Sequence, residues 1–267
     1  MSSTEWDPAE LFSEDQTPAK FALVILNCEL QLPISVYQKL WSNASYKVAA
    51  DGGANRLHTL NVNNDPISLD LDAIVGDLDS LKTDSREYWS AKGVTITYDS
   101  NQDTTDFVKS VHNLRCSQTQ QSDNIVVLGG LSGRVDQAMS VLHQIYALQK
   151  ETSYRSGRVY LLSSESITFV LQPGKHSIRA KKSFPNIALG RNIGIIPLKD
   201  ATVISTEGLE WDVHNWETEM GGRISTSNHV KEEIIIIQTS KDALFTIDLD
   251  TSDQVTEKNT NELPLHF

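Results

Sequence analysis

The chain has 267 residues, of which 39% are hydrophobic and 22% are charged, and its formal net charge is −12 at pH 7. This composition is that of a globular protein and excludes collagen-like and wholly disordered chains. The acidic balance disfavours general binding to nucleic acids or anionic membranes, because both need a basic protein surface. An acidic protein still binds a polyphosphate where metal ions mediate the contact, and it suits a cationic small molecule.

Neither a leader nor a membrane anchor is predicted. The first ten residues, MSSTEWDPAE, lack the apolar core of a signal peptide. The longest aliphatic runs, 21–26 and 234–237, are far shorter than the roughly 20 residues of a membrane span. The two cysteines, Cys28 and Cys116, form no C-x-x-C pair, so we expect no structural zinc and two reduced, buried thiols. We therefore expect a cytoplasmic protein that binds no membrane.

The N-terminal half predicts a parallel sheet covered by helices. Residues 1–19 are polar and acidic and predict a flexible extension. From residue 20 to 160, short apolar runs alternate with amphipathic segments. The predicted elements, in chain order, are a strand 21–26, helix 35–41, strand 46–50, helix 54–60, strand 72–75, helix 83–92, strand 94–98, helix 104–114, strand 124–130 and helix 136–148. The polar stretch 117–123 predicts a surface loop.

Residues 161–267 predict a second, all-β domain. Short apolar runs follow one another with turn residues between them and no convincing helix, a pattern typical of a β-sandwich. The run RVYLLSS at 158–164 fits either sheet, and the tail 251–263 is polar. The expected fold class is therefore α/β plus all-β, with a Rossmann-like parallel-sheet domain followed by a β-sandwich domain.

Four loops of the first domain follow predicted strands and are acidic or glycine-rich. In an open parallel sheet, ligands bind at the carboxyl ends of the strands. Each loop alone also has a structural explanation, such as a turn or a helix cap by Asp103 or Asp136. Asp77 and Asp79 are harder to explain, because two close carboxylates repel each other unless solvent or a cation separates them. The loops are ADGGAN (50–55), GDLDS (76–80), NQDTTDF (101–107) and GGLSGRVDQ (129–137).

Taken together, the loops predict phosphoryl-transfer chemistry. Carboxylates are the hard oxygen ligands that Mg²⁺ requires. The loop GGLSGRVDQ (129–137), called the glycine loop below, leads into a predicted helix, where backbone N–H groups can donate to phosphate oxygens. Arg134 adds a planar guanidinium that can form two hydrogen bonds to a phosphate. The Walker sequence and the dinucleotide-binding glycine fingerprint are both absent. Phosphoryl transfer needs a bound metal ion, hydrogen-bond donors to the phosphate oxygens and a cationic side chain such as arginine.

Two stretches of the second half also contain candidate ligand residues. Trp211 stands between two acidic residues in GLEWD (208–212), and STSN (225–228) gathers small hydrogen-bonding side chains. Alternatively, Trp211 is an aromatic residue of a sandwich core, and 225–228 is a turn with side-chain-to-backbone bonds.

These motifs together resemble the thiamine pyrophosphokinase (thiamine diphosphokinase) family of the eukaryotic type. They occur in the family's order over roughly residues 20–250. The resemblance implies transfer of the pyrophosphoryl group of ATP to the hydroxyl of thiamine, giving thiamine diphosphate and AMP, with Mg²⁺. The matching segments are ADGGAN, GDLDS, NQDTTDF, GGLSGRVDQ, QPGKH (172–176), GLEW (208–211) and STSN.

The resemblance also implies roles for particular residues. The catalytic residues would be Asp77, Asp79, Asp106 and Arg134, of which the three aspartates would hold the metal. ATP and substrate would contact Asp51, Gly52, Gln102, Thr105, Asp136 and Gln137. Thiamine would contact Trp211, Ser225, Thr226, Ser227 and Asn228. Residues 20–160 would form the catalytic, ATP- and Mg-binding domain and residues 161–267 the thiamine-binding domain, in a homodimer whose active site is shared between subunits.

Two other functions agree with the same residues. One is a different Mg²⁺-dependent phosphohydrolase or nucleotidyltransferase that uses the same acidic loops. The other is a thiamine-binding sensor without catalytic activity.

Overall fold

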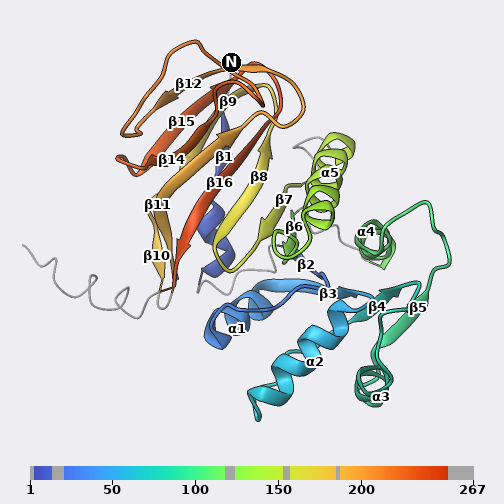
Figure 1. Cartoon of the computed structure of the whole chain (residues 1–267). Helices are drawn as coiled ribbons and strands as arrows, with labels where there is room; N and C mark the ends of the chain where they lie inside the picture. Colours follow the sequence, from blue (N-terminus) through green and yellow to red (C-terminus); the bar gives the residue numbers. More distant parts are fainter. Residues whose placement is uncertain (1–2, 14–20, 118–123, 153–156, 185–186, 252–267) are drawn as a thin grey trace, which may run out of the picture. The chain divides into compact units, whose positions relative to one another are not determined.

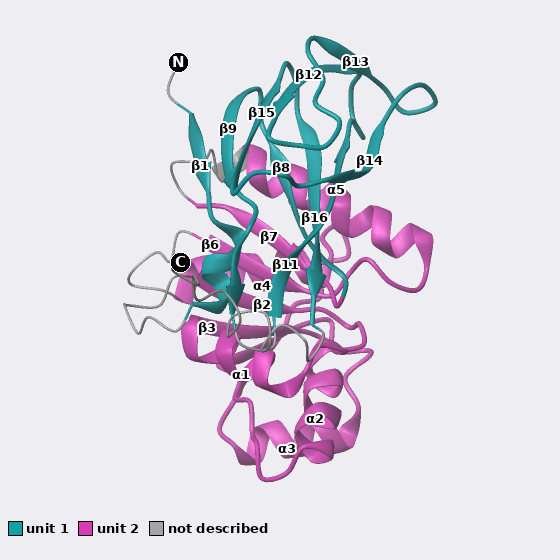
Figure 2. Ribbon diagram, turned by 90° about the vertical axis from the view of Figure 1, so that its left-hand side faces the viewer, with its two compact units in different colours: residues 1–13, 165–267 teal, residues 14–164 magenta. Residues whose placement is uncertain are grey.

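The structure is a computed structural model that describes residues 3–13, 21–117, 124–152, 157–184 and 187–251 (Figure 1). The chain forms two compact units, one of residues 14–164 and the other of residues 1–13 with 165–267 (Figure 2). The boundary between the two units therefore falls after residue 164, a few residues beyond the expected domain boundary at 160. The reason is that strand β7 (Val159–Leu162) pairs with the parallel sheet of the first unit.

The α/β unit contains a parallel sheet with its strands in the order β7-β6-β2-β3-β4-β5. Strands β2, β4 and β7 are buried at every position, as expected for a sheet that is covered on both faces. The remaining strands of this sheet are β2 (Phe21–Ile25), β3 (Ala44–Ala50), β4 (Ala73–Gly76), β5 (Thr95–Tyr98) and β6 (Asn124–Leu128).

Five helices cover this sheet, with α1, α2 and α3 on one face and α4 and α5 on the other (Figure 1). Trp89 is completely buried on the first of these faces, and its indole N–H donates to the carbonyl of Ala54 at 3.0 Å. The predicted alternation of strands and helices is confirmed. The helices are α1 (Ile34–Asn43), α2 (Gly53–Asn63), α3 (Thr83–Ala91), α4 (Asp106–Ser117) and α5 (Val135–Thr152). Residues 118–123 of the predicted surface loop lie outside the described residues.

The second unit is a β-sandwich, as the sequence predicts. One sheet has the order β1-β9-β15-β12-β13, and the other contains β10, β11, β16 and β8, with β14 paired to β11. Phe169 and Phe245 pack in its core with their ring centroids 4.9 Å apart. The strands are β1 (Thr4–Trp6), β8 (Ser166–Leu171), β9 (Gly174–Arg179), β10 (Ser183–Phe184), β11 (Ile187–Ile196), β12 (Thr202–Glu207), β13 (Trp216–Thr218), β14 (Ser225–His229), β15 (Ile234–Thr239) and β16 (Ala243–Asp250).

The N-terminal residues belong to this sandwich, so the expectation of a flexible extension is wrong for residues 3–13. Strand β1 pairs in parallel with β9, and a 3-10 helix, η1 (Pro8–Phe12), follows it. Trp6 stacks on Phe169 with 4.3 Å between ring centroids, and its indole N–H donates to Nδ1 of His176 at 3.0 Å. The apolar residues are few and irregularly spaced among acidic ones, which is why no pattern of the sequence predicts this burial. Residues 14–19 lie outside the described part of the chain.

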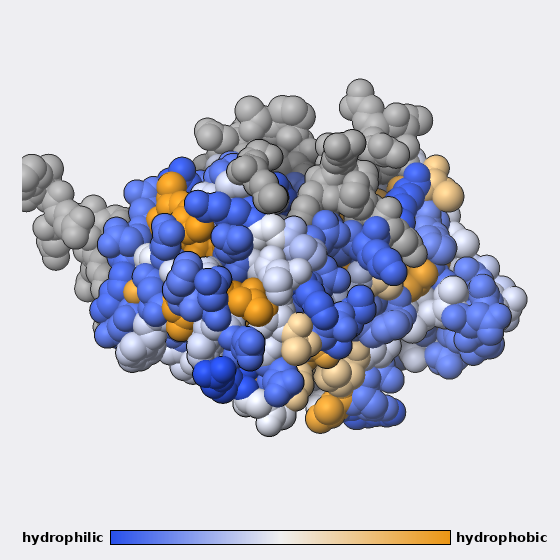
Figure 3. Space-filling view, turned by 90° about the horizontal axis from the view of Figure 1, so that it is seen from above, coloured by the Kyte–Doolittle hydropathy of each residue, from blue (hydrophilic) through white to orange (hydrophobic). Residues whose placement is uncertain are grey.

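The surface of the described residues agrees with the composition. On the face in Figure 3, hydrophobic side chains form small separate areas among hydrophilic ones. No described helix is both long and apolar enough to span a bilayer. Both cysteines are free, but Cys116 is exposed near the end of α4 and Cys28 is half-buried, so the expectation of two buried thiols is wrong. Residues 252–263 of the polar tail are not among the described residues.

Candidate active site

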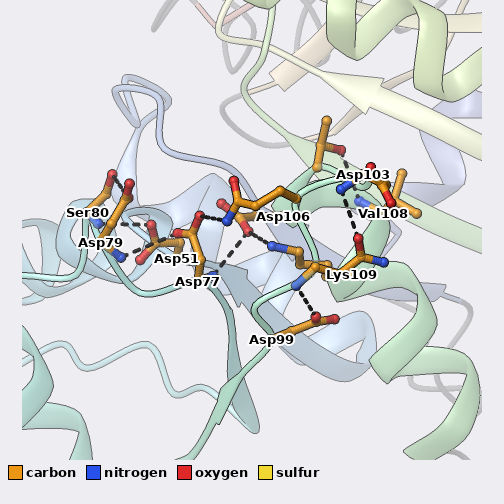
Figure 4. A network of polar contacts seen from close by, with 12 residues as sticks. Asp51, Asp77, Asp79, Ser80, Asp99, Asp103, Asp106, Val108 and Lys109 are labelled. Carbon is orange, nitrogen blue, oxygen red and sulfur yellow. Dashed lines mark hydrogen bonds and ion pairs between the residues drawn. The ribbon is translucent and has the colours of Figure 1, made fainter.

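Three carboxylates from three separate loops meet at the carboxyl edge of the parallel sheet (Figure 4). Asp51 follows β3, Asp77 follows β4, and Asp106 is the first residue of α4. One oxygen atom from each carboxylate lies within 4.8 Å of the other two. The structure thus brings Asp77 and Asp106 together, as the sequence predicts, and adds Asp51 to them.

Asp79, the third metal ligand expected from the sequence, lies outside this set of three. Its carboxylate is exposed, and Oδ1 accepts a hydrogen bond from the Ser80 hydroxyl at 2.9 Å. Leu78 has φ 60°, in the left-handed region that few residues other than glycine adopt. Asp79 still borders the set, because its amide donates to Oδ1 of Asp77 at 3.4 Å and its side chain interacts with those of Asp51 and Asp77.

Asp51 is the most unusual of the three acids, because it is buried with an unpaired oxygen. Its Oδ2 accepts a hydrogen bond from the amide of Ser80 at 3.0 Å. Its Oδ1 has no hydrogen-bond partner among the described residues. Burial and, after it, the neighbouring charges of Asp106 and Asp79 together raise the pKa of Asp51 to about 6. A cation at this position would satisfy the orphaned oxygen and relieve the repulsion.

Asp77 is held as an anion by hydrogen bonds. Nε2 of Gln102 donates to its Oδ2 at 3.2 Å, and this bond, with the amide of Asp79 and the charge of Lys109, lowers the pKa of Asp77. The preceding residue, Gly76, has no space for a side chain. A Cβ atom there would lie 2.8 Å from Cβ of Asp51 and 3.1 Å from Oδ1 of Asp106. A glycine at this position therefore allows the three carboxylates to converge.

Lys109 completes the cluster and was not predicted from the sequence. Its side chain is 2% exposed, and Nζ lies 3.0 Å from Oδ1 of Asp106, one helical turn earlier. Burial alone lowers the pKa of Lys109, but the hydrogen bond and charge of Asp106 outweigh it, helped by Asp77, so the net pKa is raised. The i, i+3 spacing in DFVK (106–109) was the available signal, since it places both side chains on one face of a helix.

Thr105 precedes helix α4 and caps its N-terminus, which orients Asp106 and Lys109. Its Oγ1 accepts from the amide of Val108 at 3.4 Å, and its carbonyl accepts from the amide of Lys109 at 3.0 Å. The cap is therefore Thr105, and the alternative that Asp103 caps this helix is wrong. Asp103 instead donates its amide to Oδ1 of Asn101 at 2.8 Å.

The three carboxylates line a cavity of about 900 Å³ in the α/β unit. Gly52, Gln102 and Thr105 line it as well, and the glycine loop contributes Ser132, Gly133, Arg134 and Gln137. Two backbone donors of that loop are occupied within the protein, unlike the sequence expectation. The amide of Gly129 donates to the carbonyl of Leu162 at 2.9 Å, and that of Gly130 to Sγ of Cys28 at 3.1 Å.

Arg134 and Asp136 form an exposed ion pair beside this cavity. Nε of Arg134 donates to Oδ1 of Asp136 at 3.1 Å, and one terminal nitrogen donates to the other carboxylate oxygen. The pairing lowers the pKa of Asp136 and raises that of Arg134. Asp136 does not itself line the cavity, so its contact with a ligand would go through Arg134.

The buried charge of Asp51 predicts a pH-dependent stability difference. Because its folded pKa lies above the ordinary value of 3.8, stability is lost as the pH rises from below 4 to above 6. We expect Asp51→Asn to increase the free energy of unfolding by about 1–3 kcal/mol at pH 7.5 and by no more than about 0.5 kcal/mol at pH 4. Urea unfolding in EDTA at the two pH values measures this. A gain of equal size at both values would contradict the assignment.

In the β-sandwich, Asn228 fixes the backbone at Trp211. Its Nδ2 donates to the carbonyl of Trp211 at 2.9 Å, and its Oδ1 accepts from the amide of Trp211 at 3.2 Å. Asn228 is buried, whereas the side chain of Trp211 is 56% exposed. The alternative that Trp211 belongs to the sandwich core is therefore wrong, and the indole faces outward.

The outward indole lies beside a charged group of side chains. The rings of Trp211 and His229 have centroids 5.0 Å apart, and Nδ1 of His229 lies 2.6 Å from Oε2 of Glu210. Contacts with His229 and Lys231 lower the pKa of Glu210. Thr226 and Ser227 are exposed on β14, and Ser225 is half-buried. These residues of 210–229 form the candidate ligand surface of the second unit.

Comparisons with known proteins agree with the division of the chain into an α/β unit and a β-sandwich unit. Residues 37–155 match the family model "Thiamin pyrophosphokinase, catalytic domain", and residues 175–244 match "Thiamin pyrophosphokinase, vitamin B1 binding domain". Thiamine pyrophosphokinase 2 of Arabidopsis thaliana is 34% identical over 246 residues, 86% of each chain. Thiamine pyrophosphokinase of Saccharomyces cerevisiae is 28% identical over 273 residues, 85% of each chain. The solved thiamin pyrophosphokinase of Candida albicans superposes with a TM-score of 0.78 at 26% identity, covering 94% of each chain.

Proposed function

The chain belongs to the thiamine pyrophosphokinase family, and from that premise we propose which of its residues bind the metal, the ATP and the thiamine. The enzyme transfers the pyrophosphoryl group of ATP to the hydroxyl of thiamine, and the products are thiamine diphosphate and AMP. The observation that carries the assignment of roles is the convergence of Asp51, Asp77 and Asp106 in the cavity of the α/β unit.

We propose that these three carboxylates hold Mg²⁺. The donor set fits the ion, because it consists of hard oxygen atoms and includes the orphaned Oδ1 of Asp51. When bound, Mg²⁺ would neutralise polyphosphate charge and polarise the phosphoryl oxygens. Asp79 remains a proposed catalytic residue beside this set, within the electrostatic reach of Asp51.

The remaining residues of the cavity act by positioning and by charge. Gln102 keeps Asp77 oriented and ionised, and Lys109 orients Asp106 through its hydrogen bond to Oδ1. Arg134 and Gln137 line the cavity on the side of the glycine loop, where they would donate to phosphate oxygens. Such a site accelerates phosphoryl transfer through orientation and charge stabilisation, without a covalent intermediate.

The β-sandwich would recognise thiamine through its fixed positive charge. We propose that the indole of Trp211 faces the thiazolium ring, a contact worth ~0.5–2 kcal/mol. The neighbouring acid Glu210 adds favourable potential for a cation. Ser225, Thr226 and Ser227 would supply hydrogen bonds, and Asn228 would act indirectly, by holding the backbone of Trp211.

Replacing the indole tests this role. We expect Trp211→Ala to raise the KM for thiamine about 2- to 30-fold, the range that corresponds to the loss of a cation–π contact. The KM for ATP and the melting temperature should change little, because the indole is exposed. Met220→Ala is the matched control, since Met220 is equally exposed in the same unit. An unchanged KM for thiamine would contradict the assignment.

We further propose that the active site is shared across a homodimer, with the acidic cavity of one subunit facing the Trp211 surface of the other. Mixed dimers test this directly. A subunit with Asp77→Asn and a subunit with Trp211→Ala would together rebuild one intact site per mixed dimer. Because Trp211→Ala acts on the KM, the assay uses a thiamine concentration well below the KM of that variant. Co-refolding equal amounts should then recover about a quarter of the wild-type activity beyond what the Trp211→Ala homodimers contribute. Activity no higher than the average of the two variants, or a fully active monomer in sedimentation, would refute the shared site.

A cytoplasmic location is proposed as well. The two cysteines are free, and the exposed Cys116 would persist as a thiol in a reducing compartment. Fractionation of cells that produce the tagged chain would test it, and recovery in a membrane or secreted fraction would contradict it.

The reaction itself is tested by incubating the chain with thiamine, ATP and Mg²⁺ and resolving all products. AMP should appear one-for-one with thiamine diphosphate. Free phosphate or pyrophosphate instead would indicate a hydrolase or nucleotidyltransferase. Thiamine binding without turnover would indicate a sensor.

A further inference from the structure

The cavity of the α/β unit is lined by one cation whose charge is not matched by an ion pair among the described residues. Lys109 is paired with Asp106, and Arg134 is paired with Asp136. The third cation, Arg56, contacts no described carboxylate. Its charge is therefore matched by no described carboxylate, whereas Lys109 and Arg134 are each paired with an aspartate before a ligand binds.

A neutral side chain orients this guanidinium. Nε of Arg56, in the first turns of α2, donates to Oδ1 of Asn27 at 2.9 Å. This bond uses only Nε and leaves both terminal nitrogens of Arg56 without a described protein partner. These two nitrogens can therefore donate together to one phosphate group. Asn27 packs closely against Gly52, where a Cβ atom would lie only 2.4 Å from Nδ2 of Asn27.

The order of the strands places this pair between the two ends of the site. Asn27 follows β2, which lies between β6, followed by the glycine loop, and β3, followed by Asp51. The chain after β2 runs along the glycine loop, since the amide of Leu26 donates to Leu128 and Cys28 accepts from Gly130. A polyphosphate that reaches from the glycine loop to the carboxylate cluster must pass this position.

We propose that Arg56 binds the polyphosphate of ATP and that Asn27 is its positioning residue. The inference rests on the proposed function of the cavity, because it names a further phosphate-binding residue in the same site. A guanidinium held by an amide keeps its full positive charge for the ligand. A carboxylate partner would instead balance that charge before the ligand arrives.

The test measures the affinity for ATP separately from turnover. Titration calorimetry with Mg²⁺ and a non-transferable analogue, α,β-methylene-ATP, gives the Kd without thiamine. We expect Arg56→Ala to raise this Kd about 10- to 100-fold, the range for a lost charge-assisted hydrogen-bond pair. In the complete assay, the KM for ATP should rise in parallel, while the KM for thiamine should stay within about twofold of the wild-type value.

Three further variants separate charge from structure. Arg56→Lys should recover only part of the affinity, since an ammonium group cannot form the bidentate fork. Asn27→Asp should weaken ATP binding without changing the melting temperature, because it gives Arg56 a carboxylate partner. Arg86→Ala, an exposed arginine of α3 outside the cavity, is the control and should behave as wild type.

Two results would overturn the proposal. One is a Kd for the analogue within about twofold of wild type in Arg56→Ala, and the other is an equal rise in the KM values for ATP and thiamine. A wild-type chain that binds the analogue but transfers nothing would refute the proposed function alone, and the Kd comparison would still decide the role of Arg56. A wild-type chain that does not bind the analogue would overturn both.

Discussion

Asp77→Asn is expected to lower kcat by at least about 10²–10³-fold, the size of effect found when one group that stabilises transition-state charge is removed. Asp77 is a member of the three-carboxylate set, and Gln102 and Lys109 both act to keep it ionised. The amide is nearly the same shape, and it removes one negative charge from a crowded cluster. The apoprotein should therefore be as stable as wild type or slightly more stable.

The measurement is AMP and thiamine diphosphate production over a range of Mg²⁺ concentrations, together with a melting curve for each protein. Asp79→Asn is the comparison, because it removes the exposed, proposed catalytic carboxylate two residues away. We expect a smaller loss of kcat for Asp79→Asn than for Asp77→Asn. An equal loss would show that Asp79 is a full member of the metal site, as the sequence alone predicts, and near-wild-type activity of Asp77→Asn would refute the site.

Lys109→Met is expected to be the most destabilising change in the site, at about 3–5 kcal/mol. The Lys109 side chain is buried against Asp106, so its removal leaves a carboxylate without its cation beside two further acids. Turnover should also fall, since Asp106 loses the bond that orients it. Saturating Mg²⁺ should restore part of the stability, because a bound cation would replace the missing charge.

Urea unfolding with and without Mg²⁺ measures both effects. Lys47→Met is the matched control, because Lys47 also pairs with an aspartate at 3.0 Å, but its partner Asp70 is 69% exposed. That variant should lose no more than about 1 kcal/mol and should not respond to Mg²⁺. Equal losses in the two variants would show that the burial of Lys109 does not set its importance.

The alternation of apolar runs and amphipathic segments was enough to predict the parallel sheet and its five helices, because each element carries its own periodicity. It was also enough to place the acidic loops at one edge, since all the strands of a parallel sheet point the same way. The change to a β-sandwich was predicted for a similar reason. The docking of residues 3–13 was not, because Trp6 and Phe12 have no repeating pattern and are buried only by contacts distant in the sequence.

The sequence by itself determined the chemistry of this protein: which loops carry carboxylates, glycines and Arg134, and which family they resemble. The tertiary structure decided which of those groups act together. It placed Asp51 with Asp77 and Asp106, left Asp79 exposed at the border of that set, and buried Lys109 against Asp106. It also left Arg56 unpaired beside Asn27, 29 residues away in the chain. The physical reason is that periodicity and motifs describe single segments, whereas burial, repulsion and pairing depend on which segments meet in space.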